Sequence, residues 1–153
     1  MSKNILLGVT GSIAASKTEI LYKKLIEKHN VKIFSTSEGL KYLSKEFINE
    51  VEVFSSWEQL EGSPHIDYAR WADLIVIYPA TANFLAKLNS GIADDLLLST
   101  VLMHKKPIYI APAMHEEMFE HRNTQKNISE LSNYHILCGP RFGKLDIGDV
   151  GSG

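Results

Sequence analysis

The sequence of 153 residues contains one cysteine, Cys138, and therefore forms neither an internal disulfide nor a cluster of thiolates. It has no run of about 18 apolar residues, the length that a membrane-spanning helix needs, so we expect no membrane partner. Lysine and arginine (16) do not outnumber aspartate and glutamate (18), which argues against a nucleic-acid partner. The six histidines follow no HExxH or CxxC pattern, and we expect no metal. An apolar start without a signal peptide predicts a cytoplasmic protein.

Short apolar runs alternate with segments of helical periodicity along the whole chain. We expect strands at residues 4–9, 31–35, 74–78, 108–111 and 135–138, and helices at residues 14–28, 38–42, 81–88, 94–103 and 123–132. This alternation predicts an α/β fold in a single domain, with a doubly wound parallel sheet of the Rossmann type. We expect residues 46–62 to be irregular and His65 to lie in a polar loop.

In such sheets, ligands bind beyond the carboxyl ends of the strands, so the loops at residues 11–13, 35–37, 79–84 and 112–118 are the candidate site. Gly11 and Ser12 put backbone N–H groups and a hydroxyl at a helix start, which suits an anion, although a plain tight turn explains them equally well. The hydroxyls of residues 35–37 either add to that site or cap the next helix.

The small residues of the motif PATAN, residues 79–83, allow a flat ring to lie close to the backbone. Thr81 is equally well explained as a helix N-cap. Met114 and Met118, four residues apart, either contact a ligand or belong to the core. His65 is a candidate acid or base near neutral pH, or else a surface histidine. Asp94 and Asp95 are expected in the first turn of a helix, where they complement its dipole; a catalytic carboxylate pair is the alternative.

Six motifs occur in the order and spacing of one enzyme family: GVTGSIAA (8–15), PHI…RWAD (64–73), PATAN (79–83), GIADDLL (91–97), APAM (111–114) and GDVGSG (148–153). The chain resembles the flavin-dependent cysteine decarboxylases over nearly its whole length. That family includes the phosphopantothenoylcysteine decarboxylases of coenzyme A synthesis and the lantibiotic peptidyl-cysteine decarboxylases. The motifs ADDLL, APAM and GDVGSG favour the coenzyme A branch.

The resemblance implies a flavodoxin-like fold that binds FMN at the interface of a homotrimer, with trimers sometimes assembled into dodecamers. It assigns His65 as the catalytic histidine, and His115 and Met118 to substrate binding. It makes residues 1–153 one flavoprotein domain. Residues 143–153 are too rich in glycine for regular structure, and their composition predicts a flexible substrate flap or tail. The residues that the resemblance assigns to FMN are Gly11, Ser12, Ile13, Ser35, Thr36 and Ser37 near the phosphate, and Thr81, Ala82, Asn83, Phe84 and Ala113 along the flavin.

The implied reaction is oxidation of a cysteine thiol by FMN to a thioaldehyde, followed by loss of carbon dioxide to leave an enethiolate. In the coenzyme A enzymes the reduced flavin then returns its electrons, so that 4′-phospho-N-pantothenoylcysteine becomes 4′-phosphopantetheine. Three positions depart from the family pattern. His115 replaces the asparagine that holds the substrate carboxylate, Ile147 replaces a catalytic cysteine, and Phe84 replaces a threonine.

Several functions remain open at this point. The first is a complete phosphopantothenoylcysteine decarboxylase. The second is a peptidyl-cysteine decarboxylase. Such an enzyme acts on a C-terminal cysteine and does not need the catalytic cysteine that Ile147 replaces. The third is a flavin-binding subunit or regulator without complete activity, and a general FMN oxidoreductase is a fourth.

Overall fold

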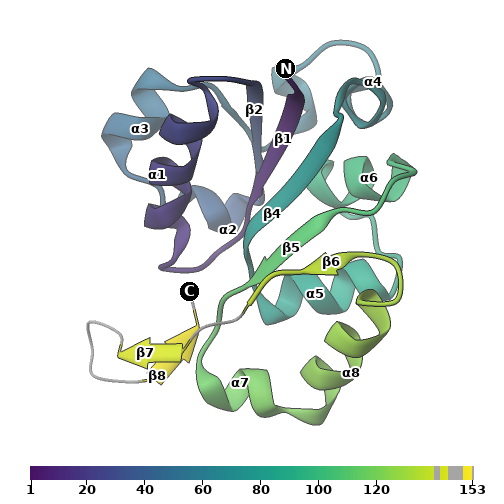
Figure 1. Ribbon diagram of the computed structural model, residues 1–153. Helices are drawn as coiled ribbons and strands as arrows, with labels where there is room; N and C mark the ends of the chain where they lie inside the picture. The colour runs from purple at the N-terminus through teal and green to yellow at the C-terminus, as the bar shows by residue number, and fades with distance from the viewer. Residues whose placement is uncertain (140–141, 145–149, 153) are drawn as a thin grey trace.

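The computed structural model describes residues 1–139, 142–144 and 150–152. One sheet of six parallel strands runs through the molecule in the order β3-β2-β1-β4-β5-β6 (Figure 1). The strands are β1 (Asn4–Val9), β2 (Asn30–Ser35), β3 (Val53–Phe54), β4 (Leu74–Ala80), β5 (Tyr109–Pro112) and β6 (Ile136–Leu137). Without the two-residue edge strand β3, the order is that of a flavodoxin-like sheet. The predicted fold class is confirmed.

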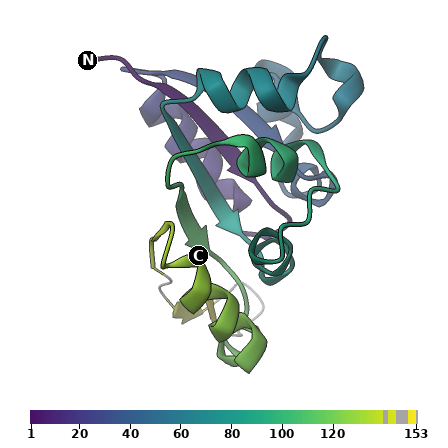
Figure 2. The ribbon, with the colours of Figure 1, turned by 90° about the vertical axis from the view of Figure 1, so that its right-hand side faces the viewer.

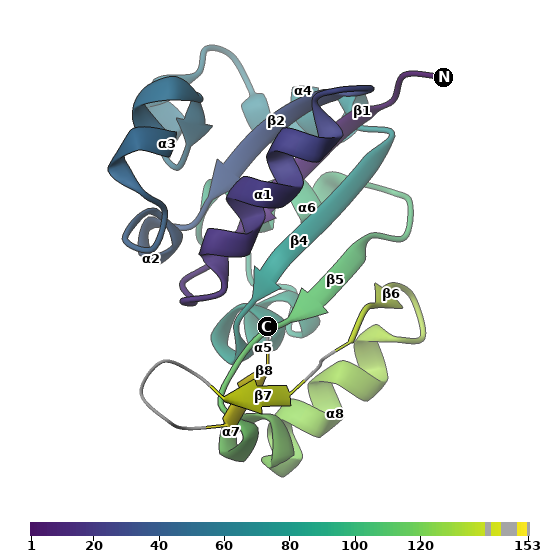
Figure 3. The same ribbon diagram turned by 60° about the vertical axis from the view of Figure 1, so that its left-hand side comes forward.

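Helices cover both faces of the sheet (Figures 2 and 3). They are α1 (Ala15–Leu25), α2 (Ser37–Leu40), α3 (Lys45–Glu50), α4 (Pro64–Trp71), α5 (Ala82–Asn89), α6 (Leu96–Met103), α7 (Glu116–Glu120) and α8 (Arg122–Leu131). Leu6 packs into a core shared with α4, α5, α6 and α8, whereas its neighbour Leu7 packs into a second core shared with α1 and α3. Both side chains are fully buried, and burial on two faces explains why β1 is an almost unbroken apolar run.

Five of the described helices begin with a side chain that accepts a hydrogen bond from a backbone N–H group, and α2, α5 and α6 are three of them. Thr36 accepts from the N–H of Gly39, Thr81 from that of Phe84, and Asp95 from that of Leu98. The N-cap interpretation of Thr81 is therefore confirmed. Helix α6 begins at Leu96, so Asp95 lies at its cap and not in its first turn as predicted.

The expectation of an irregular segment at residues 46–62 is wrong. This segment contains most of α3, the strand β3 and a turn of 3₁₀ helix at Trp57–Gln59, labelled η1. Ser44 caps α3 by accepting from the N–H of Phe47, and Phe47 is buried. These elements are short, and a two- or three-residue element has too few positions to show a period.

The expectation that His65 lies in a polar loop is also wrong, because His65 belongs to α4. Pro64 occupies the first position of that helix, where its missing N–H group costs no hydrogen bond. Pro64 marks a helix start here and not a loop. Within the loop predicted at residues 112–118, helix α7 already begins at Glu116.

The expectation that the glycine-rich tail lacks regular structure is wrong for the part that the structure describes. Strand β7 (Phe142–Lys144) pairs antiparallel with β8 (Val150–Ser152), and β8 lies beside α7 (Figure 1). Ile147 lies outside the described residues. The described residues contain no helix that is both long and apolar enough to cross a membrane.

Candidate active site

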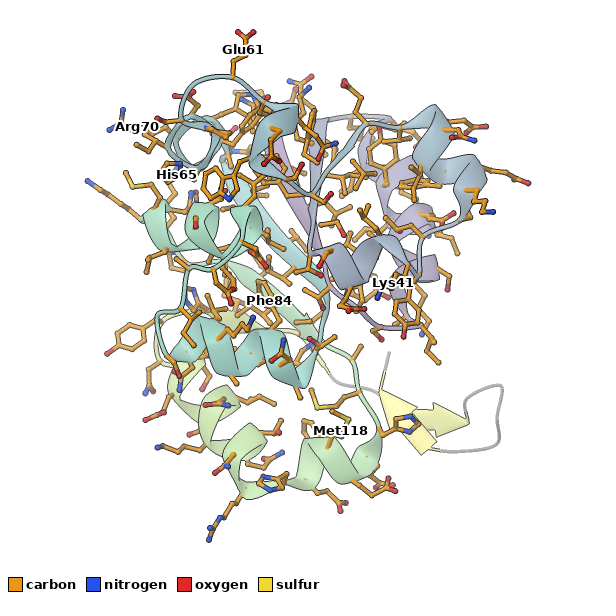
Figure 4. The ribbon with its side chains drawn as sticks, turned by 180° about the vertical axis from the view of Figure 1, so that it is seen from behind. Lys41, Glu61, His65, Arg70, Phe84 and Met118 are labelled. Carbon is orange, nitrogen blue, oxygen red and sulfur yellow. The ribbon has the colours of Figure 1, made fainter. Side chains whose placement is uncertain are left out.

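One open cavity of about 670 Å³ lies at the carboxyl edge of the sheet, where the loops after β1, β2, β4 and β5 meet. Its wall brings together twelve of the predicted site residues: Gly11, Ser12, Ile13, Thr36, Ser37, Thr81, Ala82, Asn83, Phe84, Ala113, His115 and Met118. Figure 4 labels two of these residues, Phe84 on α5 and Met118 on α7. The position beyond the strand ends is the one that the fold predicts for a ligand.

The first loop of the cavity comes very close to α2. A Cβ atom added to Gly11 would lie 2.7 Å from the Cβ of Glu38, so any larger residue would push the two segments apart. The Ser12 hydroxyl accepts from the N–H of Ala14 at 3.2 Å, which fixes the turn that leads into α1. This edge of the cavity therefore presents serine and threonine hydroxyls within one narrow loop cluster.

Thr10 joins two loops of the cavity that lie far apart in the sequence. Its hydroxyl donates to the carbonyl of Pro79 at 2.6 Å and accepts from the N–H of Thr81 at 3.0 Å. The side chain is buried, so both bonds are protected from water. The sequence interpretation missed Thr10, although its place directly before Gly11 at the end of a strand was an available signal.

The residues after β4 divide between the cavity and the core. Asn83 is exposed along the cavity wall, and Ala82 is half-buried beside it. The Phe84 side chain is only 2% exposed and belongs to the core between the sheet and α5. Phe84 therefore supports the wall from beneath and presents little surface to a ligand.

Two of the predicted site residues lie outside the cavity. The Ser35 side chain is buried, and its hydroxyl donates to the carbonyl of Thr36 at 2.7 Å. His65 lies on α4, near Arg70 in Figure 4 and away from Phe84 and Met118. Within the described part of the chain, His65 therefore belongs to a different surface from the rest of the predicted site.

Several charged groups reach the cavity, and three of them, Glu38, Lys87 and Asp95, were not assigned to the site from the sequence. The Nζ atom of Lys87 lies 2.7 Å from Oδ2 of Asp94, and this hydrogen bond raises the pKa of Lys87. Burial raises the pKa of Asp95, which also lines the cavity. His115 lines the cavity from the start of α7, and its side chain makes no capping bond there. The other lining residues that the sequence analysis did not assign are Thr10, Tyr42, Leu98 and Met114.

A family model described as Flavoprotein matches residues 1–153. The chain belongs to the Flavoprotein family. One relative is the coenzyme A biosynthesis bifunctional protein CoaBC of Bacillus subtilis, with 39% identity over 161 residues, covering 99% of this chain and 39% of the relative. The chain thus spans about two fifths of the length of the curated relatives it matches.

Solved structures of Flavoprotein relatives agree with the sequence comparison. A PPC decarboxylase variant complexed with pantothenoylaminoethenethiol has 30% identity and a TM-score of 0.89, with 100% of this chain and 90% of that chain covered. The FMN-dependent cysteine decarboxylase SpaF has 31% identity and a TM-score of 0.84, with 96% and 87% covered. The predicted relationship to the cysteine decarboxylases is confirmed.

Proposed function

We propose that this protein is an FMN-dependent decarboxylase that converts 4′-phospho-N-pantothenoylcysteine to 4′-phosphopantetheine. The observation that carries the proposal is that twelve of the residues that the family pattern assigns to the site line one cavity. The similarity of the whole chain to CoaBC proteins supports the choice of substrate. A cytoplasmic location stays a prediction from the sequence.

The residues of the cavity fit FMN in size and chemistry. A volume of about 670 Å³ lies within the usual range for cofactor sites. Gly11, Ser12 and Ser37 would hold the phosphate end, because Gly11 has no room for a Cβ beside Glu38 and the two serines offer hydroxyl donors at the cavity. Ala82 and Ala113 are small enough to let a flat ring lie against the wall. When bound, FMN supplies the two-electron acceptor that oxidises the substrate thiol.

The wall opposite the hydroxyl loops is proposed to bind the substrate. His115 would hold the substrate carboxylate, because an imidazole N–H donates to a carboxylate and the His115 side chain makes no capping bond at the start of α7. Met118 is 48% exposed and offers an adaptable apolar surface beside it. Strand β8 lies next to α7, which carries Met118, and this supports a role for the tail as a flap over the substrate.

The decisive experiment incubates purified protein with phosphopantothenoylcysteine and follows the products by mass spectrometry. We expect a yellow protein with the absorption spectrum of FMN and the formation of 4′-phosphopantetheine. Protein that stays colourless after reconstitution with FMN would contradict the cofactor, whatever its activity. Accumulation of the enethiol would instead show that the protein does not carry out the second half of the reaction. The replacement of the family cysteine by Ile147 is consistent with that outcome. FMN-loaded protein that forms no product would favour the alternative function, a flavin-binding subunit or regulator without complete activity.

A homotrimer, alone or assembled into a dodecamer, is part of the proposal. His65 lies outside the cavity of its own chain, so it reaches bound substrate only if a second copy presents it. Large apolar side chains at the cavity, Ile13 at 54% and Tyr42 at 43% exposure, would gain cover from such a neighbour. Light scattering is expected to give the mass of a trimer or of a multiple of three chains.

Mixed oligomers test whether His65 acts across the interface. His65→Asn removes the histidine, and Asn83→Trp fills the cavity from an exposed position on α5. Each variant alone is expected to be inactive. When equal amounts of the two chains mix at random, about a quarter of the sites should combine the intact cavity of one variant with the His65 of the other and be active. Mixed trimers that remain inactive would show that His65 does not serve a neighbouring cavity.

A further inference from the structure

In the described part of the chain, the Nδ1 atom of His65 lacks the hydrogen bond that usually orients a catalytic histidine. A histidine in acid–base chemistry normally uses one ring nitrogen while a carboxylate or carbonyl holds the other. The Nδ1 atom of His65 is buried and has no hydrogen-bond partner among the described residues. The other ring nitrogen, Nε2, is not a buried atom without a partner. Packing, and not hydrogen bonding, must therefore set the orientation of this ring.

The aromatic neighbour of His65 is Trp57. The two ring centroids lie 5.1 Å apart and the ring planes meet at 76°, an edge-to-face arrangement that aromatic pairs favour. Trp57 is 40% exposed, so its indole does not serve chiefly to fill the core. The contact blocks one side of the imidazole and restricts its rotation about the χ2 angle.

The turn that carries Trp57 is itself firmly held. The Oε1 atom of Gln59 accepts from the N–H groups of Ser55 and Ser56 at 2.7 and 3.0 Å. The Nε2 atom of the same side chain donates to the carbonyl of Val53 at 3.2 Å. One glutamine thus ties the 3₁₀ turn to the end of β3, which anchors the turn to the edge of the sheet.

The backbone of His65 is fixed by a separate element. His65 is the second residue of α4, directly after Pro64, whose ring restricts the first position of the helix. Helix α4 therefore fixes the backbone of His65, and the turn η1 restricts the rotation of its side chain. The two elements meet at the contact between the rings.

We propose that Trp57 is a positioning residue, which holds the His65 imidazole so that its Nε2 atom faces outward for the reaction. This inference rests on the proposed function, because it assumes that His65 takes part in the chemistry. Trp57 acts through His65 and does not line the cavity. Its loss should therefore change turnover and leave the binding of FMN and substrate intact.

The test compares Trp57→Ala and Trp57→Phe with Tyr134→Ala in the FMN-loaded enzyme. Tyr134 is a 75% exposed aromatic residue after α8 and serves as the control. Trp57→Ala is expected to lower kcat at least about 10-fold with KM within about twofold, because small misplacements of a reacting group have large effects on turnover. Trp57→Phe, which retains an aromatic edge, is expected to keep kcat within about threefold of the parent protein.

A spectroscopic readout separates this inference from the proposed function. In protein with ¹³C-labelled histidine, the ring signal of His65 is identified by its absence in His65→Asn. Trp57→Ala is expected to move and broaden that signal, because the ring current is lost and the imidazole gains freedom, while Tyr134→Ala leaves it in place. An unchanged His65 signal in Trp57→Ala would overturn the inference even in an inactive protein. So would an unchanged kcat in an enzyme that His65→Asn inactivates.

Discussion

Replacement of His65 by asparagine is expected to abolish decarboxylation and to leave FMN bound. A positioned acid or base contributes about 10²- to 10⁴-fold to a rate, and asparagine cannot exchange a proton near neutral pH. FMN should remain bound because His65 does not line the cavity of its own chain. The measurement is product formation by mass spectrometry, with the flavin absorption of the same sample as the measure of occupancy.

His121→Asn is a matched control for this substitution. The His121 ring caps α8 by accepting from the N–H of Asn123 at 3.1 Å, and asparagine is a good cap in the same position. The control is expected to keep full activity and full flavin content. If His65→Asn turned over substrate as fast as His121→Asn, His65 would have no part in the mechanism. If His65→Asn lost flavin as well, His65 would affect the cavity itself.

Gly39→Ala is expected to destabilise the protein by about 2–3 kcal/mol, the upper part of the range of about 1–3 kcal/mol that is usual for an added atom with no room. A Cβ atom at Gly39 would lie 2.7 Å from the carbonyl oxygen of Val9 and closer still to the hydroxyl of Ser35. The Val9 carbonyl accepts from the N–H of Thr36, so it cannot move without breaking that bond. For a domain of this size, thermal unfolding should shift down by about 4–12 °C.

The double variant Ser35→Ala/Gly39→Ala identifies which contact matters. Removing the Ser35 hydroxyl relieves one contact and leaves the carbonyl of Val9 in place. We therefore expect the double variant to recover only part of the lost stability. Helix α2 also carries Ser37 to the cavity, so we expect a lower FMN affinity in both the single and the double variant. Full recovery would show that only the hydroxyl was in the way, and an unchanged melting temperature in Gly39→Ala would contradict the close packing.

The strands and the cavity loops were predictable because their signals are local. A buried parallel strand such as β4 is a continuous apolar run, and a threonine followed by a helix, as at Thr81, is a common cap. The assignment of FMN contacts to particular residues came from resemblance to a family. Composition and periodicity alone left each of those loops with a purely structural alternative.

The features that sequence interpretation missed depend on contacts between distant segments. The bonds of Thr10 cross 69 and 71 positions of the chain, and its place at the end of a strand does not reveal which residues it binds. Pro64 was misjudged because proline is typical both of loops and of first helical turns. The separation of His65 from the cavity is a property of the tertiary structure, and the order of motifs along the chain does not show it.

The bonds of Thr10 also bear on how the chain folds as it is made. Strand β1 pairs with both β2 and β4, so the first strand gains its second neighbour only after about half the chain has been synthesised. Contacts between such distant segments form slowly, because a long loop must close first. The cavity is thus completed late, once Thr10 meets Pro79 and Thr81. A bound flavin would mark a chain whose central sheet is already assembled.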